Sequence, residues 1–89
     1  MKPVRLSAHA TAQAPLRGAC AAEIEEAIRL EPWGPAAFGR SEAKRQFAFG
    51  AQWNGRHYAL KLVRPVFVVE PDEILVVTVY VHHFDEAAT

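Results

Sequence analysis

Three side chains able to carry acid–base or phosphate chemistry recur at alternate positions of one apolar stretch. This stretch is Ile74–Phe84, ILVVTVYVHHF, whose β-branched and aromatic residues are typical of a strand. Because successive side chains of a strand point to opposite faces, Thr78, Tyr80 and His82 share one face. A hydroxyl, a phenol and an imidazole with a pKa of ~6.5 can together orient a phosphate and move a proton near neutral pH.

A second strand, expected from about Arg56 to Val69, supplies the neighbours of this row. We expect its core-facing residues to be Tyr58, Leu60 and Leu62, packed against Val77, Val79 and Val81. His57 and Lys61 then lie on the open face beside Tyr80. Such a set could bind a phosphate, take a proton from a ribose hydroxyl and stabilise the developing charge. The alternative is an ordinary solvated sheet face, on which lysine, histidine and tyrosine are common.

Other kinds of site find little support in the sequence. There is no glycine-rich phosphate loop and no serine-nucleophile elbow. His82 and His83 are adjacent, so they point to opposite faces of a strand. One of them with His57 or His9 is an alternative metal site, but no carboxylate or cysteine is spaced to complete a standard zinc centre. We therefore expect no metal and no cofactor.

Composition and charge set the limits of the function. The chain has 89 residues, which predicts one domain over residues 1–89, and 51% of them are hydrophobic. No apolar run is long enough to span a membrane, and no signal peptide is recognisable. Cys20 is the single cysteine, which excludes an internal disulfide, fits a cytoplasmic protein and predicts a small buried side chain. The net charge is zero, but residues 40–64 hold six basic and one acidic side chain, and residues 65–89 hold five acidic and no basic ones.

The remaining elements follow from start, stop and turn signals. Ser7 is a favourable N-cap for a first helix of about two turns, because Pro15 disrupts the helical pattern and Gly18 is a plausible stop. A second helix is predicted over residues 20–30, with Ile24, Ala27 and Ile28 on its apolar face. Residues 31–41 read as a loop pinned to the core by Trp33 and Phe38, and Asn54-Gly55 predicts a hairpin between two strands. The predicted fold is α+β, with two N-terminal helices on one face of a twisted antiparallel sheet of three to four strands.

Two blocks of the chain carry a resemblance to a known family. The first comprises His9-Ala10, Arg17-Gly18, Glu23-Ile24 and Ala27-Ile28. The second comprises residues 53–65, WNGRHYALKLVRP, followed by residues 76–81, VVTVYV. In this order and spacing, the blocks resemble a family of small, toxin-like bacterial proteins of uncharacterised function, akin to BrnT and, more distantly, to the RelE/ParE toxins. The likeness spans roughly residues 9–84.

The resemblance implies a RelE-like fold and a metal-independent ribonuclease of a toxin–antitoxin system, held silent by a cognate antitoxin protein. His9 or His82 would be the general acid or base, and Arg17 and Lys61 would hold the scissile phosphate. Thr78 and Tyr80 would orient that phosphate, and Tyr58 also matches the family pattern. Residues expected to contact RNA beyond the reacting centre are Arg40, Lys44, Arg45 and His57.

One position departs from the family pattern. Related sequences often carry an arginine four residues after the equivalent of His9, and here that residue is Gln13. This difference removes a cation, and the zero net charge points in the same direction. The alternative function is therefore a catalytically silent module on the same fold, which binds a partner protein or a second copy of the chain through a sheet edge.

Overall fold

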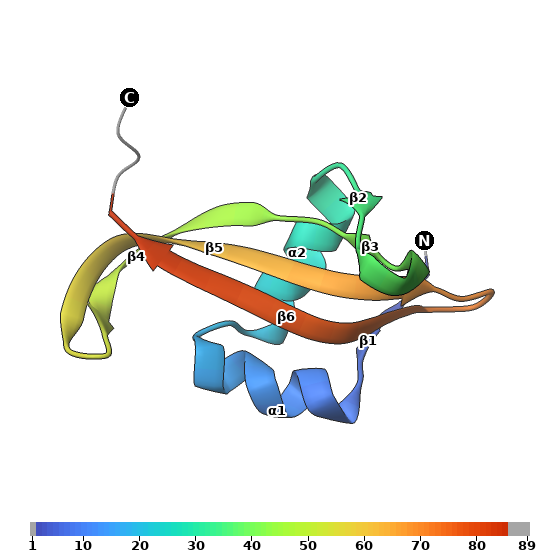
Figure 1. Ribbon diagram of the computed structural model, residues 1–89, viewed down its shortest axis with the longest axis horizontal. Helices are drawn as coiled ribbons and strands as arrows, with labels where there is room; N and C mark the ends of the chain where they lie inside the picture. Colours follow the sequence, from blue (N-terminus) through green and yellow to red (C-terminus); the bar gives the residue numbers. More distant parts are fainter. Residues whose placement is uncertain (1, 86–89) are drawn as a thin grey trace.

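Two N-terminal helices pack against a mixed, mostly antiparallel open sheet in the computed structural model, which describes residues 2–85 (Figure 1). The elements are β1 (Val4–Leu6), α1 (Ala8–Arg17), α2 (Ala21–Leu30), β2 (Gly34–Pro35), the 3-10 turn η1 (Ala37–Gly39), β3 (Ser41–Glu42), β4 (Arg45–Trp53), β5 (Arg56–Val69) and β6 (Ile74–Phe84). The order of strands is β1-β6-β5-β3-β2, and β4 also pairs with β5. The predicted α+β class is confirmed. The sheet has six strands rather than three or four, because β1, β2 and β3 are too short to give a sequence pattern.

The first helix begins where Ser7 was expected to cap it. The Ser7 Oγ accepts a hydrogen bond from the Ala10 N–H at 3.1 Å. The expectation that Pro15 shortens the helix is wrong, since α1 continues through Pro15 to Arg17, but the predicted stop at Gly18 is confirmed. A proline in the last turn removes only one helical donor, and the N–H of Gly18, at φ 85°, closes the end of the helix on the carbonyls of Ala14 and Pro15.

The second helix buries the predicted apolar stripe. Ile24 and Ala27 are fully buried and Ile28 is nearly so. Cys20 is the N-cap of this helix, and its backbone N–H donates to Glu23 Oε1 at 3.1 Å. The prediction that Cys20 is buried is therefore wrong: its place at the helix start leaves the thiol exposed.

A β-bulge divides strand β6 into two halves that bury opposite rows. Val66 of β5 pairs with Thr78, but the next residue, Phe67, pairs with Val76, so Val77 has no partner on β5. Before the bulge the even positions Ile74 and Val76 are buried; after it, the odd position Val79 is buried. Of the three residues of β6 expected in the core, Val79 is buried and Val81 packs against the core, but Val77 is not part of it.

On β5 the predicted faces are exchanged. Val63 and Phe67 are fully buried against the helices, whereas Tyr58, Leu60 and Leu62, which were expected in the core, are only partly buried. The open face, opposite α2, carries three register pairs: Leu62 with His82, Arg64 with Tyr80, and Val66 with Thr78. Both rows of β5 are largely apolar, so the sequence pattern does not show which row faces the helices. The register between β5 and β6 determines this.

Pro65 lies in the middle of the sheet, where a missing donor is usually costly. Its carbonyl accepts from the Ala43 N–H at 3.3 Å, so its own missing N–H would point to the same side. On that side β3 ends at Glu42 and β4 begins at Arg45, which leaves an interruption in the neighbouring strands. Pro65 is tolerated because it faces this interruption.

The two helices occupy different positions around the sheet. Figure 1 shows α2 behind the sheet and α1 alongside β6. The tip of the β4–β5 hairpin curls away from the sheet near the C-terminal end of β6. The core joins Ala10 and Ala14 of α1 to Ile24 and Ile28 of α2 and to Phe67 of the sheet. Within residues 2–85, no helix is both long and apolar enough to cross a membrane.

Ser7 links α1 to the bulge, because its Oγ also donates to the Val77 carbonyl at 3.3 Å. Replacing it with alanine should lower the free energy of unfolding by about 1–2 kcal/mol, since a helix cap and a bond to the bulge are both lost. Urea denaturation measures this change. Ser41 is the matched control: its hydroxyl makes no hydrogen bond within residues 2–85, and Ser41→Ala should change stability by less than about 0.5 kcal/mol. Equal effects of the two substitutions would contradict the assigned role of Ser7.

Candidate nucleic-acid interface

Tyr80 stands at the centre of the candidate site, on the open face of β6. Its ring keeps 44% of its surface exposed. The guanidinium carbon of Arg64 lies 4.7 Å from the ring centroid, and that of Arg17 lies 5.3 Å away. Both distances are within the range of a cation–π interaction, so two arginines from different elements hold this one ring.

The two arginines reach Tyr80 by different routes. Arg17 is the last residue of α1, and its Nη1 donates to the Val79 carbonyl at 2.8 Å. Arg64 is the register partner of Tyr80 on β5, and its Nη1 donates to Glu42 Oε1 at 3.0 Å. Arg64 is therefore neutralised by a carboxylate. Arg17 has no salt bridge to any of the described residues.

Open hollows lie on either side of Tyr80. One, of about 460 Å³, lies between the end of α1 and the hairpin tip, and its lining includes Arg17 and Trp53. The other, of about 210 Å³, lies beneath η1, and its lining includes Phe38, Arg40 and Arg64. Tyr80 lines both hollows. We call the resulting strip of aromatic and guanidinium side chains the aromatic–arginine track; it comprises Trp53, Arg17, Tyr80, Arg64, Arg40 and Phe38.

Phe38 is the most exposed aromatic residue of the track. It was expected to pin its loop to the core, and this expectation is wrong: 92% of its surface is exposed. Its φ of 61° is in the left-handed region, which is strained for a bulky side chain. Trp33 does pin the loop as predicted, with its ring edge-on to Phe67 at 5.0 Å. The guanidinium of Arg40 lies 5.8 Å from the Phe38 ring, and Arg40 has no salt bridge among residues 2–85.

Several residues predicted for the site do gather here. Arg17, Arg40, Thr78 and Tyr80 all line the two hollows. The Thr78 Oγ1 also lies 3.5 Å from the Oε1 of Gln13, the residue that departs from the family pattern. His82, two residues beyond Tyr80 on the same strand, is exposed and stacks on Phe84 with the ring centroids 5.5 Å apart.

Lys61 does not join the site, which corrects the expectation that it shares a face with Tyr80. Only 8% of its side chain is exposed, and it points towards the turn between the helices. There its Nζ donates to the Gly18 carbonyl at 2.6 Å and to Glu23 Oε1 at 2.9 Å. The reason is the exchange of faces on β5. Lys61 is the register partner of His83, not of the open row, so it braces the helices instead of meeting a phosphate.

The other predicted basic residues are dispersed. Arg45 faces α2, where it forms ion pairs with Glu26 and Glu31. Lys44 is exposed between β3 and β4, and His57 is exposed near the hairpin tip, opposite Gln52. His9 is exposed on α1, two turns before Arg17. None of these four residues lines either hollow of the track.

Arg64, Phe38 and Trp53 are track residues that the sequence pattern missed as site residues. Counting back from the turn at residues 70–73 would pair Arg64 with Val79, and it is the bulge at Val77 that makes Tyr80 its partner instead. Phe38 carried no local signal, since its exposure follows from a backbone angle. Trp53 is brought in by the curl of the hairpin, which is a tertiary feature.

Comparisons give no independent identification. The chain matches no protein-family model, no curated protein and no solved structure. Within residues 2–85, no three or more of its histidine, cysteine, aspartate and glutamate side chains gather closely enough to hold a metal ion.

His83 lies on the helix side of the track, packed among aromatic rings. It stacks on Trp53 with the centroids 4.5 Å apart and meets the edge of Phe49 at 4.8 Å. Its Nε2 is buried with no hydrogen-bond partner among the described residues. Burial is the main cause that lowers the pKa of His83, and the charges of Lys61 and His82 lower it further.

This lowered pKa predicts a pH-dependent stability. Because the unfolded chain binds the proton of residue 83 more readily than the folded chain, the contribution is fully present above the ordinary pKa of 6.5 and is lost as the pH falls below it. We expect the melting temperature to fall on acidification below pH 6.5, and His83→Phe to flatten this slope. His57→Phe, at an exposed position, is the control and should leave the slope unchanged. An NMR titration that places the pKa of His83 above 6.5 would contradict the assignment.

Proposed function

We propose that the aromatic–arginine track binds single-stranded RNA. The observation that carries this proposal is the half-exposed Tyr80 ring with the guanidinium groups of Arg17 and Arg64 within cation–π distance of it. Aromatic rings stack on unpaired bases regardless of their identity, and arginine binds phosphate and also stacks on bases. Protein sites for single strands combine these two elements.

The arrangement of charge supports a single-stranded ligand. Arg17 and Arg40 lie on opposite sides of Tyr80 and have no carboxylate partner in the described part of the chain, so both are available to phosphates. Phe38 and Tyr80 offer two exposed rings along the same strip, and Trp53 lines one end of it with His83 stacked on its ring. Since the chain has no net charge, we expect few phosphate contacts and therefore moderate affinity with a shallow dependence on salt.

Tyr80→Ala tests the binding proposal directly. Loss of a stacking platform should weaken binding of a fluorescent single-stranded RNA about tenfold or more, whereas Tyr80→Phe keeps the ring and should bind within about threefold of the unaltered protein. Tyr58→Ala is the matched control, because Tyr58 also lies beside an arginine, Arg56, at 5.1 Å, but outside the two hollows. Fluorescence anisotropy measures all four proteins. Equal affinities for Tyr80→Ala and Tyr58→Ala would exclude the track as the binding surface.

The same surface leads us to propose RNA cleavage as the activity, in line with the resemblance to ribonuclease toxins. His82 follows Tyr80 on the open face and is an available proton carrier. It would remove the proton of a ribose 2′-hydroxyl, and the 2′-oxygen would attack phosphorus. The bond from phosphorus to the 5′-oxygen would break and that oxygen would take a proton from water, giving a 2′,3′-cyclic phosphate and a 5′-hydroxyl. Arg17 and Arg40 would stabilise the phosphate charge. Lys61 has no part in this scheme, since Gly18 and Glu23 already hold its ammonium group.

Cleavage of this kind needs no metal. We expect products from a synthetic RNA in the presence of EDTA, no cleavage at a 2′-deoxy substitution, and a rate that falls about a hundredfold or more in His82→Ala. His57→Ala is the control histidine and should retain the rate, while His9→Ala tests the second histidine that the resemblance suggests. Electrophoresis of the products provides the measurement. A rate that is abolished by EDTA, or unchanged in both His82→Ala and His9→Ala, would refute the proposed chemistry.

A cognate antitoxin, if the chain is a toxin, would have to cover this track and present acidic side chains to Arg17 and Arg40.

The second candidate function is a silent binding module. The observation that favours it is β4, which pairs only with β5 and so leaves one edge free within residues 2–85. RNA that is bound but uncut, together with a dimer by light scattering, would favour that module over the enzyme.

A further inference from the structure

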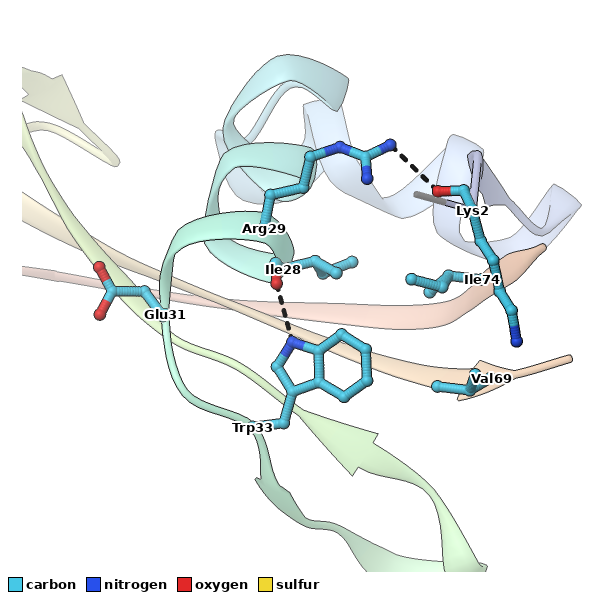
Figure 2. A pocket seen from close by; sticks show the side chains of 7 residues that line it. All are labelled: Lys2, Ile28, Arg29, Glu31, Trp33, Val69 and Ile74. Atoms are coloured by element: carbon cyan, nitrogen blue, oxygen red, sulfur yellow. Dashed lines mark hydrogen bonds between the residues drawn. The ribbon is translucent and has the colours of Figure 1, made fainter.

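Two pockets of this molecule differ in how their polar side chains are arranged. Figure 2 shows the pocket of about 380 Å³ at the end of α2, where the charged groups of Lys2, Arg29 and Glu31 point in different directions. In the hollow of about 210 Å³ beneath η1, a guanidinium and a carboxylate that line it are bonded to each other: the Arg64 Nη1 donates to Glu42 Oε1 at 3.0 Å. Selective sites depend on a few polar groups that converge, so the hollow beneath η1 is the better candidate for one.

The strand register directs Glu42 to the open face of the sheet. Glu42 of β3 pairs with Val66 of β5, and Val66 pairs with Thr78 of β6, so the three side chains form one row across the strands. The next row holds Arg64 and Tyr80, and both rows line the hollow beneath η1. The Glu42 side chain keeps 24% of its surface exposed, and its second oxygen, Oε2, has no hydrogen-bond partner within residues 2–85. The hollow therefore holds an oriented carboxylate with an unused acceptor.

A carboxylate beside the aromatic–arginine track restricts which part of an RNA can enter this hollow. It repels phosphate groups, whereas the imino and amino groups of a base donate hydrogen bonds to it. Phe38 and Tyr80 line the same hollow and offer exposed rings to a base. The volume is below the ~300–1,000 Å³ that is typical of small-molecule sites, which fits one base better than a whole nucleotide.

The four bases present different groups to a carboxylate. Guanine carries two adjacent donors, N1–H and N2–H₂, on its Watson–Crick edge, so one carboxylate can accept from both. Cytosine and adenine present an amino group next to an acceptor nitrogen, and uracil presents one imino group between two carbonyls. Guanine also has its O6 acceptor next to N1–H, within reach of a donor held beside the carboxylate. A carboxylate has about four lone-pair sites, so the bond from Arg64 to Glu42 leaves room for two more.

We propose that the hollow beneath η1 selects guanine in a single-stranded RNA through the carboxylate of Glu42. Glu42 would accept from N1–H and N2–H₂, Arg64 would donate to O6, and the base would lie against the rings of Phe38 and Tyr80. This inference rests on the proposed binding of RNA by the track, and it adds the base that the track prefers.

The test compares fluorescent RNA pentamers that differ only in the central base, UUNUU, by fluorescence anisotropy on the full chain. The guanine pentamer should bind about tenfold more tightly than those with adenine, cytosine or uracil. Inosine, which lacks only the N2 amino group, should lose most of this advantage, whereas 7-deazaguanine keeps both donors and should bind like guanine. The opposite result, with inosine bound like guanine and 7-deazaguanine bound weakly, would overturn the proposal in favour of an arginine that contacts O6 and N7. Tighter binding of the cytosine pentamer would overturn it as well.

Glu42→Gln separates recognition of the base from a purely structural role of the carboxylate. The amide cannot accept two hydrogen bonds side by side, and it leaves Arg64 without a counter-charge. The preference for guanine should therefore fall about tenfold, while the uracil pentamer binds at least as tightly as before. An equal change for all four pentamers would mean that Glu42 only holds Arg64 in place, and would overturn the proposal.

Glu73→Gln is the matched control. Glu73 also accepts from an arginine, Arg5, at 2.7 Å, but it lines neither hollow of the track, so its substitution should leave the preference unchanged. If Glu42→Gln does not fold, the guanine, inosine and 7-deazaguanine pentamers on the unaltered chain still decide.

Failure of guanine selection and failure of RNA binding give different results. Equal binding of all pentamers that is still weakened by Tyr80→Ala would overturn guanine selection and leave RNA binding in place. A chain that binds none of the pentamers would overturn both proposals.

Discussion

The bulge at Val77 is the constraint on which the rest of the structure depends. It lets one strand bury Ile74 and Val76 in its first half and Val79 in its second half. Without the extra residue, a strand that buried its first half correctly would turn Tyr80 inward and Val79 outward, because a shift of one position moves every side chain to the other face. Ser7 connects this bulge to the start of α1: it accepts from Ala10 and donates to the Val77 carbonyl. Helix placement and strand alternation are therefore coupled at Ser7, whose backbone N–H also donates to the Val76 carbonyl at 2.9 Å.

The aromatic–arginine track is a consequence of this arrangement. Because the bulge turns Tyr80 to the open face, it lies opposite Arg64 in the β5–β6 register. Helix α1 runs beside β6 far enough to bring Arg17 to the same ring. The lysine expected at this site is instead directed beneath the helix turn, where it holds Gly18 and Glu23. The structure thus separates a buried cation that stabilises the helices from exposed arginines that can meet a ligand. This separation is why RNA binding is proposed on Arg17 and Tyr80 rather than on Lys61.

Most local signals in the sequence were reliable, apart from those at Pro15, Cys20 and Phe38, whereas signals that depend on register were not. The cap at Ser7, the apolar stripe of α2, the Asn54-Gly55 hairpin and the bounds of β5 and β6 all follow from the chemistry of neighbouring residues, and the structure confirms them. The faces of β5 could not be assigned from the sequence, because both of its rows are largely apolar. In addition, a lysine can be buried when a carboxylate and a carbonyl accept hydrogen bonds from its ammonium group. Of the candidate site, Thr78, Tyr80, Arg17 and Arg40 were predicted and do lie together. Arg64 and Phe38 were missed because a strand pairing and one left-handed backbone angle place them.

The central claim is that unpaired bases stack on Tyr80 at the open face of the sheet. Intermolecular NOEs between the ring protons of Tyr80 and the base protons of a short single-stranded RNA measure this contact directly. We expect such NOEs, together with changes in amide chemical shift on RNA binding that are concentrated at Arg17, Arg64 and Phe38 and absent at Lys61. A saturated complex in which the Tyr80 ring has no RNA neighbour, or in which the shifts centre on Lys61 and the helix turn, would contradict it.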